Sequence, residues 1–320
     1  MWSQPLIAEF RPADTVIGFF VVRKKQIRTQ KDSGDPYLFL ELGDSSGRIG
    51  ATLWERPKEW YQEINEGDIV KVQGTVMEFQ DRLLLSVKRI RRATENDPLS
   101  ELDLLPRSKE DPQVLFERLL EEMSKMEDEA LRSLVERTLK EPGTRERLLR
   151  APAGKLWHHT YIGGLLEHTL SVLRITEFLA SHYPGVDREL LRAGALLHDV
   201  GKAFELDTGG FIEYSDAGRL LGHITIGVRL VHDAAQHVQG LSENRLNQLL
   251  HLILSHHGDN EKGSPVKPAT VEAILLHYAD EIDSKIAGVQ RIIDREEEPG
   301  RRWSSYVKLL DRYIYFGEKE

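Results

Sequence analysis

The chain has 320 residues, no cysteine and a formal net charge of −9 at pH 7. Without cysteine it can form neither a disulfide nor a thiolate metal site, so any metal must be held by nitrogen and oxygen ligands. The first residues show no basic segment followed by a long apolar run, and no stretch approaches the roughly 18 apolar residues that a membrane span needs. We therefore expect a cytoplasmic protein without a membrane partner.

Charge is distributed unevenly along the chain and suggests two parts. Residues 1–92 hold 15 Lys and Arg against 13 Asp and Glu, a balance of +2. The remaining residues hold 28 against 39, a balance of −11. The first part can therefore approach a polyanion, whereas the second would repel one unless bound cations changed the local field.

Residues 1–92 contain five segments with the β-branched, aromatic or alternating pattern of strands. Turn clusters separate these segments, and a short helical segment lies between the third and the fourth. The predicted strands are residues 15–30, 37–42, 48–54, 69–79 and 82–90, and the predicted helix is residues 57–64. This order is typical of an OB-fold barrel, so we expect residues 1–92 to form a small all-β domain of that fold.

The second and third predicted strands place a distinct set of side chains on the outside of this barrel. If their aliphatic residues face the core, the outward set contains Tyr37, Phe39, Arg48 and Trp54. OB folds bind single-stranded nucleic acid by stacking bases on aromatic rings and neutralising phosphates with cations. We therefore predict a nucleic-acid-binding surface here; the alternative is that the rings pack against the second domain or another subunit.

The rest of the chain predicts a linker followed by helices. Residues 93–112 contain three prolines and several acids without a clear period, which indicates a linker. From residue 113 onward apolar residues recur at helical spacing, so residues 113–320 should form an all-α domain. The last segment gathers aromatic residues that favour docking on the domain surface or a subunit contact, and we expect a homo-oligomer: Trp303, Tyr306, Tyr313, Tyr315 and Phe316.

All twelve histidines lie in the helical part, between His158 and His277. The adjacent His198 and Asp199 follow an apolar run, and burying such a pair is costly unless a divalent metal compensates it. Further histidines and one carboxylate lie in or beside other helical segments, as in metal sites built on helical bundles. We expect one metal at His168, His198, Asp199 and Asp280, and a second at Asp199, His223, His256 and His257.

Asp199 is the expected bridge between the two ions, because a carboxylate has two oxygens that can each face a cation. Two cations roughly 3.5–4 Å apart can deprotonate a shared water and stabilise a displacement at phosphorus. Lys202 would face the negative charge that grows on the phosphate. His158 and His159 could contact the phosphate or protonate the leaving oxygen, with a structural role as the alternative. Arg219 is a further candidate for phosphate binding.

The order of these residues resembles that of the HD-domain metal-dependent phosphohydrolases. Five local motifs behind a predicted OB barrel are, moreover, similar to the YhaM family of 3′–5′ exoribonucleases: WHHTYIGGLLEHT, LLHDVGK, GRLLGH, LSHHG and HYADEID. The resemblance covers residues 16–315. It implies a nuclease that binds manganese or a similar divalent ion (Co²⁺, Mg²⁺, Fe²⁺ or Ni²⁺). Such an enzyme releases nucleoside 5′-monophosphates from single-stranded RNA, and DNA is a second candidate substrate.

Two alternatives stay open. The HD-GYP cyclic-dinucleotide phosphodiesterases share the ligand series, although Gly164 stands where some of them carry a third-metal Glu. One alternative is thus a nucleotide or cyclic-dinucleotide phosphohydrolase that uses the barrel for assembly. The other is a non-catalytic nucleic-acid-binding regulator. The sequence leaves open the metal, the choice between RNA and DNA, and the number of subunits.

Overall fold

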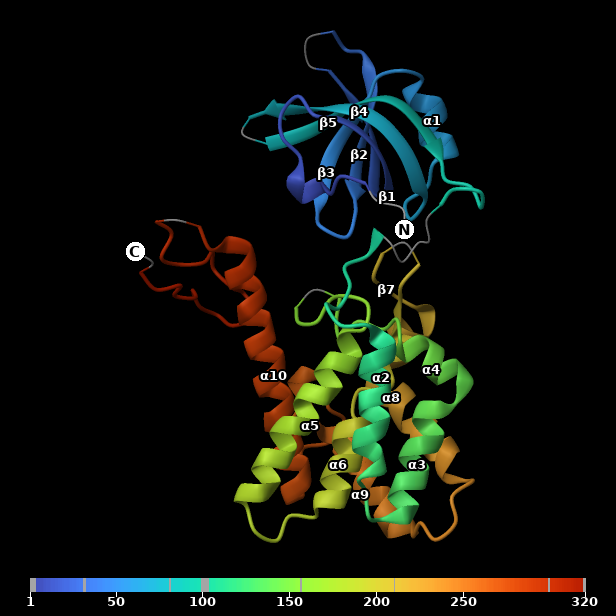
Figure 1. The fold of residues 1–320 in the computed structure, drawn as a ribbon, viewed down its shortest axis with the longest axis vertical. Coiled ribbons are helices and arrows are strands. Elements are labelled where there is room, and N and C mark those ends of the chain that lie inside the picture. The colour runs from blue at the N-terminus through green and yellow to red at the C-terminus, as the bar shows by residue number, and fades with distance from the viewer. Residues whose placement is uncertain are drawn as a thin grey trace. The chain divides into compact units, whose positions relative to one another are not determined.

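The computed structural model describes residues 4–30, 33–80, 82–98, 104–155, 157–209, 211–298 and 300–318. The chain divides into two compact units, shown in Figure 1. The first contains Met1–Arg107 and Thr208–Ile212, and the second contains Ser108–Asp207 and Glu213–Glu320. Each unit has a hydrophobic core of its own.

The first unit is a closed barrel with the strand order β1-β2-β3-β5-β4. After a short 3₁₀ helix (Ile7–Glu9), its elements are β1 (Thr15–Thr29), β2 (Pro36–Gly43), β3 (Arg48–Leu53), α1 (Pro57–Glu63), β4 (Ile69–Phe79) and β5 (Arg82–Arg92). Strands β3 and β5 pair in parallel and close the barrel, while the other neighbouring strands are antiparallel. The predicted OB-fold barrel is therefore confirmed.

Alternation along the strands separates the core of the barrel from its surface. On β2, Leu38, Leu40 and Leu42 are fully buried, whereas Tyr37 and Phe39 are only partly buried. Side chains in a strand alternate between the two faces, so this pattern directs the leucines inward. The two rings lie on the outer face, as the sequence predicted.

The second unit is a helical bundle with one short hairpin. Its helices are α2 (Pro112–Ser124), α3 (Glu129–Lys140), α4 (Pro142–Leu148), α5 (Gly164–His182), α6 (Arg188–Leu197), α7 (Lys202–Glu205), α8 (Asp216–Ala235), α9 (Glu243–Ser255) and α10 (Val271–Glu296). A 3₁₀ helix (Asn260–Lys262) lies between α9 and α10. The hairpin pairs β6 (Leu206–Asp207) with β7 (Glu213–Tyr214), within the part of the chain that was predicted to be all-α. The helical fold is otherwise confirmed.

Part of the predicted linker and of the turns between the predicted strands falls outside the described residues. These positions are residues 99–103 of the linker and Lys31, Asp32 and Asp81 of the turns. The boundaries 1–92, 93–112 and 113–320 therefore stay a prediction. None of the helices that the structure describes has the length and apolar character needed to cross a bilayer.

The aromatic residues after α10 pack on one another. Trp303 and Tyr315 pair through their backbones, with ring centroids 4.8 Å apart, and the rings of Tyr306 and Tyr313 lie 5.3 Å apart. About half of the surface of each of these four residues is exposed. Their predicted docking or subunit contact stays a prediction.

Helix α6 lies at the centre of the bundle core. Nearly all of its residues from Leu190 to Leu197 are buried. A Cβ atom at Gly194 would lie 2.4 Å from the side chain of Leu252, so the glycine allows α9 to pack closely against α6. Close packing of these two helices brings their C-terminal ends together, and both ends carry predicted metal ligands.

Arg245 on α9 joins the N-terminal ends of two other helices. The side chains of Asp128 and Asp187 cap α3 and α6, and the Arg245 guanidinium donates hydrogen bonds to both carboxylates. Burial raises the pKa of Asp187, but the bonds from Arg245 and from the Leu190 backbone lower it more. The pKa of Asp187 therefore lies below its usual value.

We expect Arg245→Ala to lower the free energy of unfolding by about 1–2 kcal/mol at pH 7, because charge-assisted hydrogen bonds are lost at a partly exposed site. A lowered folded-state pKa stabilises the fold above the unfolded pKa of Asp187 and loses this effect as the pH falls through the folded value. The difference from the wild type should thus shrink in acid. Urea unfolding followed by circular dichroism measures it, and Arg229→Ala, at an exposed residue of α8, is the control. An equal loss in both variants would contradict the assignment.

Candidate metal centre

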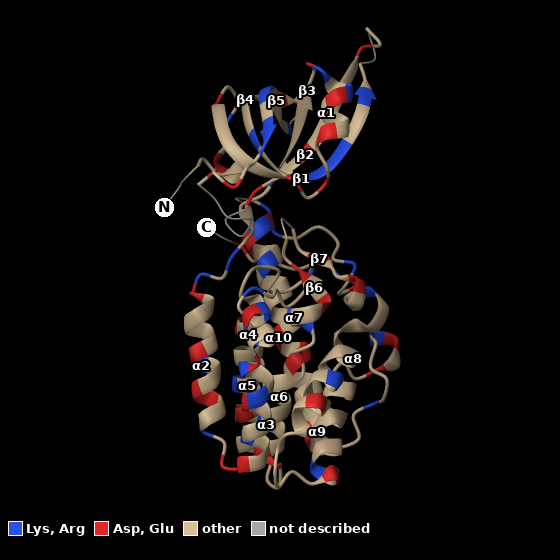
Figure 2. Cartoon of the chain, turned by 90° about the vertical axis from the view of Figure 1, so that its right-hand side faces the viewer, with Lys and Arg blue, Asp and Glu red and all other residues tan. Residues whose placement is uncertain are grey.

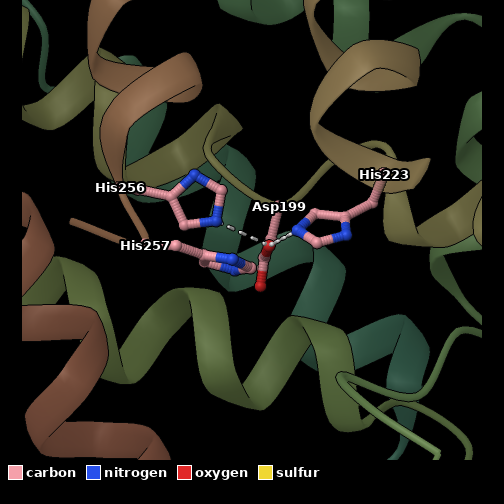
Figure 3. A group of neighbouring side chains, drawn as sticks. All are labelled: Asp199, His223, His256 and His257. Atoms are coloured by element: carbon pink, nitrogen blue, oxygen red, sulfur yellow. Dashed lines mark ion pairs between the residues drawn. The ribbon is translucent and has the colours of Figure 1, made fainter. Parts of the chain in front are cut away.

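Five segments of the helical unit bring histidines and carboxylates to one place. His168 and Asp280 belong to α5 and α10, and His223 belongs to α8. The other four residues follow the C-terminal ends of α6 and α9: His198, Asp199, His256 and His257. Figure 3 shows the Asp199 carboxylate facing the rings of three of these histidines. All seven residues predicted as metal ligands therefore lie together.

Their ligand atoms form two groups, each within 4.8 Å. One group contains Asp199, His223, His256 and His257, and the other contains His168, His198 and Asp280. The Asp199 carboxylate faces both groups. Its Oδ1 lies 3.6 Å from Nε2 of His223 and 3.4 Å from Nε2 of His256. Its Oδ2 lies 3.3 Å from Nε2 of His168 and 3.4 Å from Nε2 of His198.

The end of α9 explains how two adjacent histidines can face the same group. Successive residues of a regular helix point about 100° apart, so the helix has to end before both rings can converge. It ends at Ser255, and Gly258 has a φ of 85°, a conformation that favours glycine. A Cβ atom at Gly258 would also lie 2.3 Å from the ring of His277, whose Nδ1 donates to the His256 carbonyl 2.8 Å away.

Hydrogen bonds at Nδ1 orient the five histidines of the two groups. The partner is an oxygen in each case: the Ala195 carbonyl for His198 (2.9 Å), the Ile253 carbonyl for His256 (2.7 Å), the Lys262 carbonyl for His257 (2.9 Å), Glu205 for His223 (3.1 Å) and Asp283 for His168 (2.7 Å). A carbonyl oxygen only accepts, so in the first three histidines Nδ1 carries the proton. In the neutral ring Nε2 then keeps a free lone pair, which is the form of imidazole that binds a metal.

Buried polar atoms at the centre lack hydrogen-bond partners within the described chain. These atoms are Oδ1 of Asp199 and Nε2 of His223 and His256. A buried polar group without a partner costs about 1–3 kcal/mol. A divalent cation would satisfy all three atoms, and imidazole nitrogens with carboxylate oxygens are an established donor set for several such ions. The residues present therefore fit a metal centre.

A cavity of about 700 Å³ opens onto this centre. Donors from both groups line it, among them His223, His257 and Asp280, together with Lys202 and His158. Its outer part combines cations with apolar side chains: Lys155, Lys262, Lys285, Trp157, Tyr214, Leu309 and Leu310. The volume lies in the range of about 300–1,000 Å³ that is common for small-molecule sites.

Both structural units match models of known protein families. Residues 165–285 match the model of the HD domain, and residues 20–93 match the model of the OB-fold nucleic acid binding domain. The chain carries an OB fold followed by an HD domain. The HD domain indicates a metal-dependent phosphohydrolase that uses divalent ions, and both donor groups lie within the matched residues.

Several solved structures align with a small part of the chain. A crystal structure of a domain of replication protein A from Methanococcus maripaludis is 27% identical, covers 28% of this chain and 92% of its own, and has a TM-score of 0.23. The NMR structure of the second OB-fold domain of that protein is 28% identical, with coverages of 29% and 96% and a TM-score of 0.23. The p204 HINb domain is 15% identical, with a TM-score of 0.23, and the chain spans 47% of its length.

Asp283 and Glu205 hold two of the HD-domain histidines in place, although the sequence did not single them out. Asp283 is 8% exposed, and its Oδ2 also contacts Nε2 of His159 at 3.1 Å. Glu205 accepts hydrogen bonds from the ring and the backbone of His223. For Asp283 the sequence did hold a signal, because residues three apart share a helix face and Asp280 is three residues away.

The two histidines predicted as catalytic lie in different surroundings. His158 lines the cavity of the HD domain, and neither of its ring nitrogens has a hydrogen-bond partner in the described chain. Burial, with the nearby charges of Lys202 and His168, lowers the pKa of His158 to about 3, so its ring is neutral at pH 7. His159 instead contacts the hydroxyl of Tyr161 at 2.8 Å and lies behind His168. The catalytic roles of both stay predictions.

The two cations predicted to bind phosphate also differ. Nζ of Lys202 lies 2.6 Å from Oδ2 of Asp199. Burial lowers the pKa of Lys202, but the carboxylates of Asp199 and Asp280 raise it more, so this amine stays charged. Arg219 is exposed, pairs with Glu213 at 2.9 Å and lies 5.7 Å from the ring centroid of Tyr214, which lines the cavity, although Arg219 itself does not.

We expect Asp283→Asn to weaken metal binding by about 10- to 100-fold, because an amide holds the ring of His168 less firmly than a carboxylate does. Titration of the metal-free protein with Mn²⁺, followed by calorimetry, measures the affinity. Glu281→Gln is the control, since Glu281 lies on the same helix and pairs with Lys262 and Lys285 outside the two donor groups. Unchanged Mn²⁺ affinity in Asp283→Asn would contradict the orienting role.

Proposed function

We propose that the protein is a metal-dependent 3′–5′ exoribonuclease that releases nucleoside 5′-monophosphates from single-stranded RNA. The observation that carries the proposal is the position of the Asp199 carboxylate between two groups of metal-binding donors, in a chain that also has an OB fold. A two-metal phosphodiesterase needs a carboxylate shared between its two metal sites. An enzyme that acts on a nucleic-acid polymer gains affinity from an OB fold that binds the single strand.

We propose that the two donor groups hold two divalent ions, with Mn²⁺ the first candidate. His168, His198, Asp199 and Asp280 would hold one ion, and Asp199, His223, His256 and His257 would hold the other. When bound, such a pair lowers the pKa of a shared water and supplies positive charge beside the phosphate.

Side chains that line the cavity would place the terminal phosphodiester. Lys202 would provide a point charge for the non-bridging oxygens, and its ion pair with Asp199 holds the amine at the centre. The neutral ring of His158 has one N–H, which it can donate to the phosphate or to the leaving 3′ oxygen. The apolar wall formed by Trp157, Tyr214 and Leu309 would receive the terminal base.

The barrel would hold the RNA chain through the surface that the sequence predicted. The rings of Tyr37 and Trp54 stack there with centroids 4.6 Å apart, and Trp54 is 44% exposed. The Arg28 guanidinium lies 3.7 Å above the ring of Phe39. Exposed rings of this kind can stack on bases of any sequence.

A nucleotide or cyclic-dinucleotide phosphohydrolase is the second candidate. It is favoured by the cavity, whose lining residues all belong to the helical unit, so that a small nucleotide could be bound without the barrel. A non-catalytic regulator is less well supported, because the full set of donors is present.

We expect Asp199→Ala to slow RNA degradation by at least about 10²-fold, because both ions would lose their shared ligand. The assay incubates 5′-labelled single-stranded RNA with Mn²⁺, and the wild type should give a ladder that shortens from the 3′ end. RNA affinity measured in EDTA should be unchanged in the variant, since the barrel is intact.

Asp233→Ala is the control, because Asp233 is exposed on α8 and its ion pair within the described residues is with the neighbouring His232. If the wild type leaves RNA intact but hydrolyses free or cyclic nucleotides, the second candidate is correct. Normal RNA degradation by Asp199→Ala would overturn the role of this centre.

A further inference from the structure

The β-bulge on strand β5 makes two consecutive cations point outward from the barrel. In the β4–β5 pairing, Gln73 is opposite Arg89 and Gly74 is opposite Val87, so Lys88 is an extra residue on β5. A bulge interrupts the alternation of a strand and redirects its side chains. Lys88 and Arg89 are therefore both exposed, although strict alternation would turn one of them into the core.

Two observations support this reading of the bulge. Val87 and Ile90, on either side of the two cations, are both buried in the barrel core. A Cβ atom at Gly74 would lie 2.5 Å from the Ser86 carbonyl oxygen, so the glycine allows the bulged strand to approach. The backbone conformation of the bulge thus makes both Lys88 and Arg89 point outward.

These two cations line a hollow of about 480 Å³ on the barrel. Strand β5 carries five cations and no acidic residue, and its blue segments are visible in Figure 2. The charged residues around the hollow are the cations Arg56, Lys71, Lys88, Arg89 and Arg91 and one acid, Glu55. Its apolar wall includes Ile17, which is 54% exposed, and Trp60.

Most of the positive charge in the hollow is not neutralised by the protein. Arg56 pairs with Glu59, and Arg91 pairs with Asp97. Lys71, Lys88 and Arg89, in contrast, form no ion pair within the described part of the chain, and Lys71 keeps its charge while it lies 5.1 Å from the ring centroid of Phe19. Free cations that line a concave surface attract an anionic ligand.

The aromatic surface of the barrel has less free charge. Arg48 pairs with Glu41 at 3.1 Å, which leaves Arg28, 3.7 Å above the ring of Phe39, as the cation there without an ion pair in the described chain. Bases can stack on this surface, but it offers few cations for the phosphates that connect them. A strand of RNA therefore needs a second surface on the barrel for its backbone.

The hollow adjoins the aromatic surface. Strands β3 and β5 run in parallel, and the last pair in their register is Thr52 with Ser86. Trp54 follows the last residue of β3, and both of its neighbours in the chain, Leu53 and Glu55, line the hollow. A chain whose base stacks at Trp54 thus has the hollow beside it for its phosphates.

We propose that this hollow is the phosphate-binding site of the barrel for single-stranded RNA, with Lys71, Lys88 and Arg89 as its contacts. The inference rests on the proposed RNA substrate. It assigns the contacts to the RNA phosphates to the bulge on β5, whereas the sequence had assigned them to Arg48. The Tyr37–Trp54 pair keeps the role of stacking bases.

The test is the double variant Lys88→Glu and Arg89→Glu in the full chain, with a fluorescent oligouridylate in EDTA so that the RNA stays intact. We expect binding at least about 10-fold weaker, because two phosphate contacts become repulsive. The slope of log K against log salt should fall by about 1.4, since each contact to a single strand contributes about 0.7. The variant Lys88→Arg and Arg89→Lys should keep the wild-type affinity and slope.

The matched control is Arg11→Glu with Arg82→Glu, which changes the net charge equally at exposed cations outside the hollow. It should bind RNA more tightly than the first variant and keep the wild-type salt slope. Equal weakening in both variants, or unchanged binding in the first, would overturn the proposal. Hydrolysis of bis(4-nitrophenyl) phosphate with Mn²⁺ should be the same in all variants. Its absence in the wild type would refute the proposed enzyme, while the binding data would still decide the role of the hollow.

Discussion

The structure of the helical unit depends on one buried carboxylate. Asp199 is 1% exposed, and an uncompensated charge at such a position would strongly destabilise the fold. Its neighbours remove most of this penalty: Lys202 forms a close ion pair, and four imidazoles lie within 3.6 Å of its oxygens. Burial alone raises the pKa of Asp199, but these groups lower it far below its usual value. The packing of α6 against α9 serves to assemble this arrangement.

Two of those imidazoles are held by the same hydrogen-bonding arrangement at the end of a helix. His198 and His256 each follow the last residue of a helix, and Nδ1 of each donates to the carbonyl three residues earlier. The final carbonyls of a helix have no partner within it, so each ring satisfies one of them. The bond also fixes the proton on Nδ1 and directs Nε2 toward Asp199. The C-terminal ends of α6 and α9 thus fix the positions of two nitrogens that can bind a metal.

Much of this could be predicted from the sequence, because it depends on local patterns. Strand alternation and turn residues defined the barrel, and the order of His and Asp residues predicted the seven donors that the structure brings together. The features that the sequence did not predict depend on contacts between segments that are distant in the chain. Asp283 looks like an exposed helix acid until α5 is packed beside it, and 115 residues separate it from His168. The bulge at Lys88 shows only when β5 is aligned with β4.

The contact between Gly258 and the ring of His277 limits how this centre can change. Even a methyl group at position 258 would overlap the imidazole and disfavour the backbone angle that ends α9. The missing side chain at this position thus helps to form the centre, since it lets the His256 carbonyl meet the ring of His277. A substitution of this one glycine would therefore displace both histidines, even though it removes no donor from the centre.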